Sequence, residues 1–191
     1  ILQDERLRSA LDAYTSEGAH GKLLDSSSEN LETSSWVCFE MEAIMEHKQV
    51  VRPVLSYLFH RLEEKFDGSP TLLILDEAWL FLDHPIFSQK IREWLKVLRK
   101  KNVSVVFATQ NLSDIEGSSI APTLREACNT KVFLPNPMAM QPGSASCYEK
   151  FGLNQRQIEI LATATPRRDY YYTSPLGNRL FSLDLSQLAL A

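Results

Sequence analysis

Four short apolar runs, each long enough for one β-strand, alternate along the chain with segments of helical periodicity. The runs lie at residues 36–40, 71–75, 103–109 and 131–134. Strands of a parallel sheet are covered by helices on both faces, so they form nearly continuous apolar runs instead of alternating ones. The run at 71–75 has this character and is predicted to be buried on both faces. The alternation predicts an α/β fold, with a parallel sheet that has helices on both of its faces.

The segments between these runs have the signatures of helices. Apolar residues recur at helical spacing over 51–62, and Pro53 should lie in the first turn, where its missing N–H costs no hydrogen bond. A second helix is predicted over 87–98, with basic residues on its other face. A third should begin at Ser113, because Glu116 three residues later completes a capping-box pattern.

The C-terminal region is predicted to add a small helix and a β-hairpin. Asn154 is placed to cap the helix, and the runs 170–173 and 179–183 flank a five-residue loop at 174–178. This hairpin should extend an edge of the sheet. The consecutive tyrosines 170–172 could stack on nucleic-acid bases, although alternating aromatic residues in a strand more often serve packing.

Composition restricts the class of protein. Of the 191 residues, 44% are hydrophobic and 23% charged, as in soluble globular domains, and the net charge is −4. This charge argues against a wholly basic nucleic-acid module, but not against a local basic patch. No apolar run approaches the ~20 residues of a membrane span. Three cysteines at uneven spacing indicate a reducing compartment instead of a disulfide framework.

We expect two regions: a polar lead-in at 1–35, with a short helix and a loop, and an α/β core at 36–191. The chain begins at Ile1 with neither an initiator Met nor a signal peptide. It therefore looks like a cytosolic piece of a longer protein.

Two adjacent acids, Asp76 and Glu77, follow the most apolar strand directly. Parallel sheets place their chemistry at the carboxyl ends of their strands. There, Asp76 can hold the hydrated Mg²⁺ that bridges nucleotide phosphates, and Glu77 can polarise the attacking water. The alternative is a turn in which both acids are simply solvated.

Gln110 follows the third apolar run in the same way. In a parallel sheet it would lie beside Glu77, where its amide could hydrogen-bond the γ-phosphate or the water. Such a sensor would couple hydrolysis to movement of the attached element. Taken alone, Gln110 is also compatible with an ordinary residue at a turn or helix entry.

A basic run at Arg99 ends the second predicted helix. Cations are favoured at helix C-termini by the helix dipole, which is sufficient to explain the run. Alternatively, Arg99 reaches a phosphate in a neighbouring subunit and stabilises the charge of the transition state. Arg125 and the pair Arg167 and Arg168 are further candidates for this role in trans.

No phosphate-binding loop of the form G-x-x-x-x-G-K-[ST] occurs in the 191 residues. The one Gly-Lys pair is Gly21-Lys22, but Ser16 stands where the first glycine is required and Leu23 where Ser or Thr is required. The sequence thus has the metal and water half of an ATPase site without the phosphate cradle. We expect the cradle to lie upstream, and the isolated chain to be inactive.

Taken in order, these motifs resemble the conjugative-transfer ATPases of type IV secretion systems, the TrbE/CagE/VirB type. The similarity extends from about Trp36 to the C-terminus. It rests on residues 73–79 (LILDEAW), 99–102 (RKKN), 108–110 (ATQ), 131–137 (KVFLPNP), 152–153 (GL) and 167–171 (RRDYY). The combined order is specific, whereas Asp-Glu-Ala-Trp alone is shared by many RecA-like motors.

The resemblance implies a RecA-like domain that binds ATP and Mg²⁺ and assembles into a hexamer or a smaller oligomer. It implies ATP-driven pilus assembly and substrate transfer, together with other secretion subunits, at the cytoplasmic face of a bacterial inner membrane. Asp76 would be the metal-binding acid, Glu77 the catalytic acid, Gln110 the sensor and Arg99 the trans arginine. DNA is a further partner that the resemblance leaves open.

Two other interpretations stay open. One is a related DNA-translocating RecA-like motor, such as a coupling protein or a HerA-type helicase, whose hydrolysis duplex DNA would stimulate strongly. The other is a non-catalytic docking module that binds other secretion components through the helical face and the C-terminal hairpin.

Overall fold

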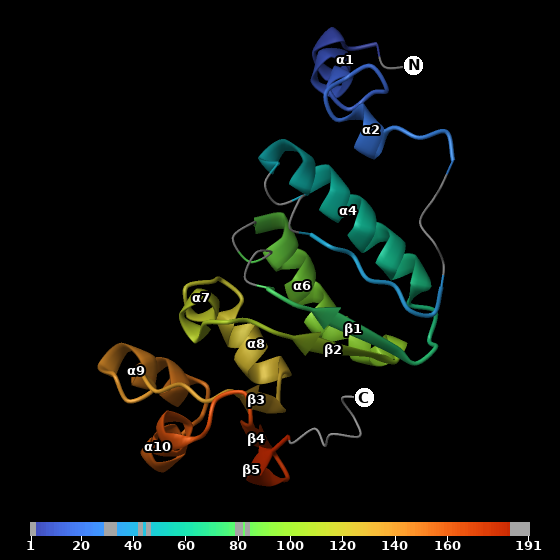
Figure 1. Cartoon of the computed structure of the whole chain (residues 1–191). Helices are drawn as coiled ribbons and strands as arrows, with labels where there is room; N and C mark the ends of the chain where they lie inside the picture. Colours follow the sequence, from blue (N-terminus) through green and yellow to red (C-terminus); the bar gives the residue numbers. More distant parts are fainter. Residues whose placement is uncertain are drawn as a thin grey trace, which may run out of the picture. The chain divides into compact units, whose positions relative to one another are not determined.

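The computed structural model describes residues 3–28, 34–41, 44, 47–78, 82 and 85–183 (Figure 1). The chain divides into two compact units, 1–65 and 66–191. The sequence predicts that the α/β core begins at residue 36, and this boundary stays a prediction. Residues 29–33, just before it, lie outside the described residues. Within the described part of the chain, no helix has both the length and the apolar character needed to cross a membrane.

Three helices are described in the first unit: α1 (Glu5–Asp12), α2 (Gly21–Leu24) and α4 (Lys48–Lys65). A small core forms on α4 around Val50, Val54 and Leu58. Phe39 and Met41 pack against this core. The prediction of a strand at 36–40 is therefore wrong: these residues form no strand, and of their apolar side chains only Phe39 packs on α4, whereas Trp36 and Val37 are exposed.

Pro53 lies in the interior of α4 and not in its first turn, because the helix begins at Lys48. Proline has no N–H to donate to the carbonyl four residues earlier, which here is the carbonyl of Gln49. The hydroxyl of Tyr14 donates to that carbonyl at 3.0 Å. The N-terminal segment thus supplies the hydrogen bond that the proline removes.

The second unit contains a parallel sheet of β1 (Thr71–Leu75) and β2 (Val103–Phe107), paired from Thr71↔Val103 to Leu75↔Phe107. Between them, α6 (Pro85–Val97) continues into the 3-10 turn η1 (Leu98–Lys101) and contributes buried side chains to the core. The structure differs from the predicted burial of 71–75 on both faces. Leu73 and Leu75 are buried, whereas Leu72 is 59% exposed and Ile74 52%.

The fourth apolar run joins a different sheet from the one predicted. β3 (Lys131–Phe133) pairs antiparallel with β4 (Asp169–Ser174), which pairs antiparallel with β5 (Gly177–Ser182). The predicted hairpin is present, but its loop has two residues instead of five, because Ser174 pairs with Gly177. Gly177 has a φ of +137°, a conformation that suits glycine and allows so tight a turn.

Two short helices connect the sheets, α7 (Leu112–Glu116) and α8 (Ala121–Ala127). The capping box predicted at Ser113 is wrong, because α7 begins at Leu112 after the cap residue Asn111. Glu116 instead forms ion pairs with Arg125 and, at 3.1 Å, with Lys150. Its carboxylate therefore links α7 to α8 and to α9 (Pro142–Lys150).

Helices α9 (Pro142–Lys150) and α10 (Gln155–Thr163) complete the second unit (Figure 1). The predicted cap at Asn154 is confirmed: its side chain accepts from the Gln157 N–H at 3.0 Å, and the Gln157 side chain accepts from the Asn154 N–H at 2.7 Å. Both helices pack with β3 and β4 in one core. Its buried members are Phe133, Ala139, Tyr148, Leu153, Ile158, Leu161 and Tyr171.

Candidate functional site

The carboxyl ends of β1 and β2 lie side by side, and the backbone bonds continue past the strands. The Ala108 N–H donates to the Leu75 carbonyl at 2.9 Å, and the Ala78 N–H donates to the Ala108 carbonyl at 3.0 Å. Ala78 is fully buried. The two segments that carry the predicted site residues are thus held together by the same kind of hydrogen bond as the strands themselves.

Asp76 and Glu77 occupy the turn between β1 and Ala78. The Glu77 N–H donates to Oδ1 of Asp76 at 3.0 Å, and Glu77 has a φ of +48°. Non-glycine residues in the left-handed region cost roughly 1–3 kcal/mol and persist only where the surroundings fix them. Here Leu75 and Ala78 on either side are fixed by the bonds to β2, so the turn places Asp76 in solvent with Glu77 half-buried beside it.

Gln110 lies next to Glu77, as the parallel sheet predicts. The Nε2 amide of Gln110 donates to Oε1 of Glu77. This bond joins the segment after β2 to the acid after β1, and it orients the Glu77 carboxylate.

Asp76 has the chemistry of a magnesium ligand in a nucleotide site. It is exposed, and its Oδ1 accepts the Glu77 N–H. Among the described residues, no group of three or more His, Cys, Asp or Glu could hold a metal ion. Mg²⁺ in nucleotide sites is held by one or two carboxylates together with substrate phosphates and water, so a single exposed carboxylate fits that donor set.

The arginines proposed for a role in trans lie elsewhere. Arg99 is in η1, before the amino end of β2, whereas Gln110 follows the carboxyl end; a five-residue strand of about 16 Å separates them. Arg125 is paired with Glu116. Arg167 is exposed in the turn before β4, with a φ of +63°. Within the described residues, the structure records no hydrogen bond or ion pair from any of these arginines to Glu77 or Gln110.

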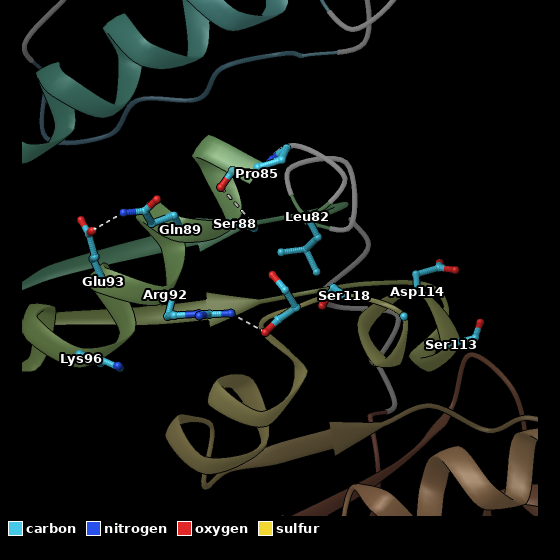
Figure 2. A pocket seen from close by; sticks show the side chains of 12 residues that line it. Leu82, Pro85, Ser88, Gln89, Arg92, Glu93, Lys96, Ser113, Asp114 and Ser118 are labelled. Carbon is cyan, nitrogen blue, oxygen red and sulfur yellow. Dashed lines mark hydrogen bonds between the residues drawn. The ribbon is translucent and has the colours of Figure 1, made fainter.

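A groove of about 1060 Å³, which no sequence pattern indicated, lies between α6 and the start of α7 with its following loop. Figure 2 shows Arg92 reaching across from α6, where its Nη2 donates to the Ser119 carbonyl. Lys96 and Asp114 also line the groove, so its charge is mixed. One wall, α6, comes after Glu77 in the sequence, and the other, the start of α7 with its following loop, comes after Gln110. Trp79, which ends the acidic motif, lies outside the described residues.

Comparison with solved structures defines the class of fold. The chain resembles VirB4 of Thermoanaerobacter pseudethanolicus with a TM-score of 0.70 at 20% sequence identity, covering 98% of this chain and 51% of that one. The predicted α/β class, with a parallel sheet and a C-terminal hairpin, is therefore confirmed. It is the class of the P-loop nucleotide-binding domains.

The family follows from sequence comparison. The model of the TraG P-loop domain matches residues 3–163, and the chain belongs to this family. It is 51% identical over all 191 residues to the conjugal transfer protein TrbE of Rhizobium radiobacter, and 49% identical to a probable conjugal transfer protein TrbE of Sinorhizobium fredii. The chain spans 23% and 29% of the lengths of these two relatives. The resemblance to transfer proteins of the TrbE and VirB type is confirmed.

Proposed function

We propose that the full-length protein is an ATP-hydrolysing motor subunit of a conjugative, type IV secretion apparatus that drives pilus assembly and the transfer of DNA or protein. In this proposal Asp76 binds Mg²⁺, Glu77 polarises the attacking water, and Gln110 senses the γ-phosphate. Membership of a P-loop family and the names of the two TrbE relatives support it.

The single observation that carries the proposal is the hydrogen bond between Gln110 and Glu77. A general base must be oriented toward the water that it activates, and a donor from the neighbouring strand end fixes the direction of this carboxylate. If Asp76 and Glu77 formed only a solvated turn, there would be no reason for the Gln110 amide to hold the Glu77 carboxylate.

Mg²⁺ would supply charge neutralisation at the phosphates, with Asp76 as its protein ligand. The 191 residues contain no phosphate-loop motif, so the phosphates would be held by another part of the full-length protein. Arg99 acts in trans in this proposal; it lies before the amino end of β2, at the opposite end of the strand from Gln110 of its own chain. Hydrolysis would then require a homo-oligomer, for which we propose a hexamer bound to other secretion subunits at the cytoplasmic face of the inner membrane.

The test is Glu77→Gln in the full-length protein. The substitution keeps the size of the side chain and removes the base, so we expect ATP turnover to fall by about 10²- to 10⁴-fold with ATP still bound. Glu126→Gln, an exposed glutamate on α8, is the matched control and should keep normal turnover. If the Glu77→Gln variant hydrolysed ATP at the wild-type rate, the motor interpretation would be wrong and the docking-module interpretation would remain.

Two further measurements separate the alternatives. The purified 191-residue chain should show no multiple-turnover hydrolysis of ATP, and a sustained rate would contradict the need for a separate phosphate cradle. Strong stimulation of the full-length protein by duplex DNA, with translocation along it, would instead favour the coupling-protein or HerA-type motor.

A further inference from the structure

The antiparallel sheet of β3, β4 and β5 has two chemically different faces. One face contributes Phe133 and Tyr171 to the core that α9 and α10 cover (Figure 1). Successive residues of a strand point to opposite faces, so the neighbours of these residues form the other face. We call this the open face, and it includes Val132, Arg168, Tyr170, Tyr172, Arg179 and Phe181, with the exposed Leu183 opposite Arg168. None of them is buried.

Aromatic rings occupy the middle of the open face. Tyr170 and Phe181 are directly opposite in the register, with ring centroids 5.6 Å apart and planes 23° apart. Tyr172 is two residues further along β4, opposite Val132, which is 52% exposed. Tyr170 and Phe181 pack ring against ring, and the ring faces that solvent reaches are also suitable surfaces for stacking a planar ligand.

Arginines lie at both ends of this aromatic row. Arg179 is opposite Tyr172 in the register. At the other end, the Arg168 carbonyl accepts the Leu183 N–H at 2.9 Å, so the pairing continues past β4 and places Arg168 on the same face as Tyr170. The two arginines are four rows apart, which is about 13 Å along the strands.

The one acid in β4 is turned to the other face. The Asp169 carboxylate accepts the Ser182 hydroxyl at 2.6 Å and the Thr165 N–H at 2.8 Å, and these bonds hold the pKa of Asp169 below its ordinary value. No Asp or Glu stands on the open face within the described strands. The face is therefore cationic, although the whole chain carries a net charge of −4.

We propose that the open face binds single-stranded nucleic acid. Stacking on aromatic rings requires unpaired bases, and arginines at either end of the row match the charge of the phosphates. A protein partner could cover the apolar residues, but it would have to provide two acids about 13 Å apart. The backbone of a nucleic acid carries regularly spaced negative phosphates, so it can meet both arginines whatever its base sequence.

The test is fluorescence anisotropy of the 191-residue chain with a labelled 20-nucleotide oligothymidine, and with a 20-base-pair duplex for comparison. We expect the single strand to bind more tightly than the duplex at 50 mM salt. Tyr172→Leu and Phe181→Leu should each weaken binding by about 5- to 150-fold, as loss of one stacked base does. Tyr172→Phe should restore it, because only the ring is needed.

Arg179→Gln should reduce the slope of log K against log salt by about 0.7, the value for one phosphate contact to a single strand. Two variants off the open face serve as controls: Leu180→Ala on the opposite face of the same strand, and Arg156→Gln on the surface of α10. Glu77→Gln should also bind normally, so the result is independent of the proposed hydrolysis.

Several outcomes would overturn the proposal. One is the absence of binding to the oligothymidine at 50 mM salt, and another is equal affinity for the duplex. A third is unchanged binding in the open-face variants, provided that circular dichroism shows them folded. If these variants instead alter self-association in sedimentation and no oligonucleotide binds, the face is a protein interface.

Discussion

The two sheets of residues 66–191 differ in the chemistry of the face that each leaves open to solvent. The antiparallel sheet has a complete core on one face, with Phe133 and Tyr171 at 7% and 5% exposure beneath α9 and α10. The parallel sheet buries Leu73 and Leu75 on one face and leaves Leu72 and Ile74 on the other largely exposed. Each sheet buries one face and leaves the other open to solvent; the open face of the parallel sheet is aliphatic, whereas that of the antiparallel sheet carries aromatic rings and arginines.

The proposed site and the C-terminal core lie in different parts of the second unit, so substitutions in them should have different effects. The proposed catalytic groups follow the carboxyl ends of the parallel strands, where Asp76 and Gln110 are exposed. The C-terminal core has buried side chains and one capped helix, α10, but its buried residues include no carboxylate. We therefore expect substitutions in the C-terminal core to change unfolding, and substitutions at the ends of β1 and β2 to change turnover.

The largest expected effect on stability is that of Leu161→Ala. Leu161 is fully buried in the C-terminal core, and removing its branched side chain should lower the free energy of unfolding by about 2–5 kcal/mol. Urea denaturation followed by circular dichroism measures this. Leu134→Ala, at 60% exposure, should stay within about 0.5 kcal/mol of wild type. A similar, small change for both would show that the C-terminal core is loosely packed.

A smaller effect is expected for Asn154→Ala, which removes the cap of α10. Loss of an N-cap side chain typically costs about 1 kcal/mol, and here the Gln157 N–H would also lose its acceptor. The midpoint of urea unfolding should shift accordingly, with Gln155→Ala at the exposed first position of α10 as the control. Equal midpoints for the two variants would mean that the helix does not depend on its capping box.

Local patterns were sufficient to predict many elements. Apolar runs and helical periodicity located β1, β2 and most of α6, and the cap residue Asn154 located α10. The adjacency of Glu77 and Gln110 also followed from the sequence, because parallel strands bring their carboxyl ends to one edge of a sheet. Only the strand direction was needed to place these two side chains together.

Interactions between distant residues could not be predicted in this way. The three residues of β3 have no local signal that selects β4 over β2 as a partner. Glu116 fits a capping box in the sequence, but Arg125 and Lys150 provide stronger partners once the helices pack. α9 was missed because Pro142, Gly143 and its serines have low helix propensity, although proline is well suited to a first turn.

The smallest expected effect tests the exposed face of β1. Leu72 and Leu73 are adjacent residues of the same type on opposite faces, at 59% and 8% exposure. Leu72→Thr should leave the free energy of unfolding within about 0.5 kcal/mol of wild type, whereas Leu73→Thr should lower it by about 2 kcal/mol or more, because it buries a hydroxyl and removes apolar contacts. Urea denaturation of the two variants at equal concentration measures the difference. A large loss for Leu72→Thr that grows with protein concentration would mean that a second copy covers this face in solution. The contrast between the two sheets would then apply only to the monomer.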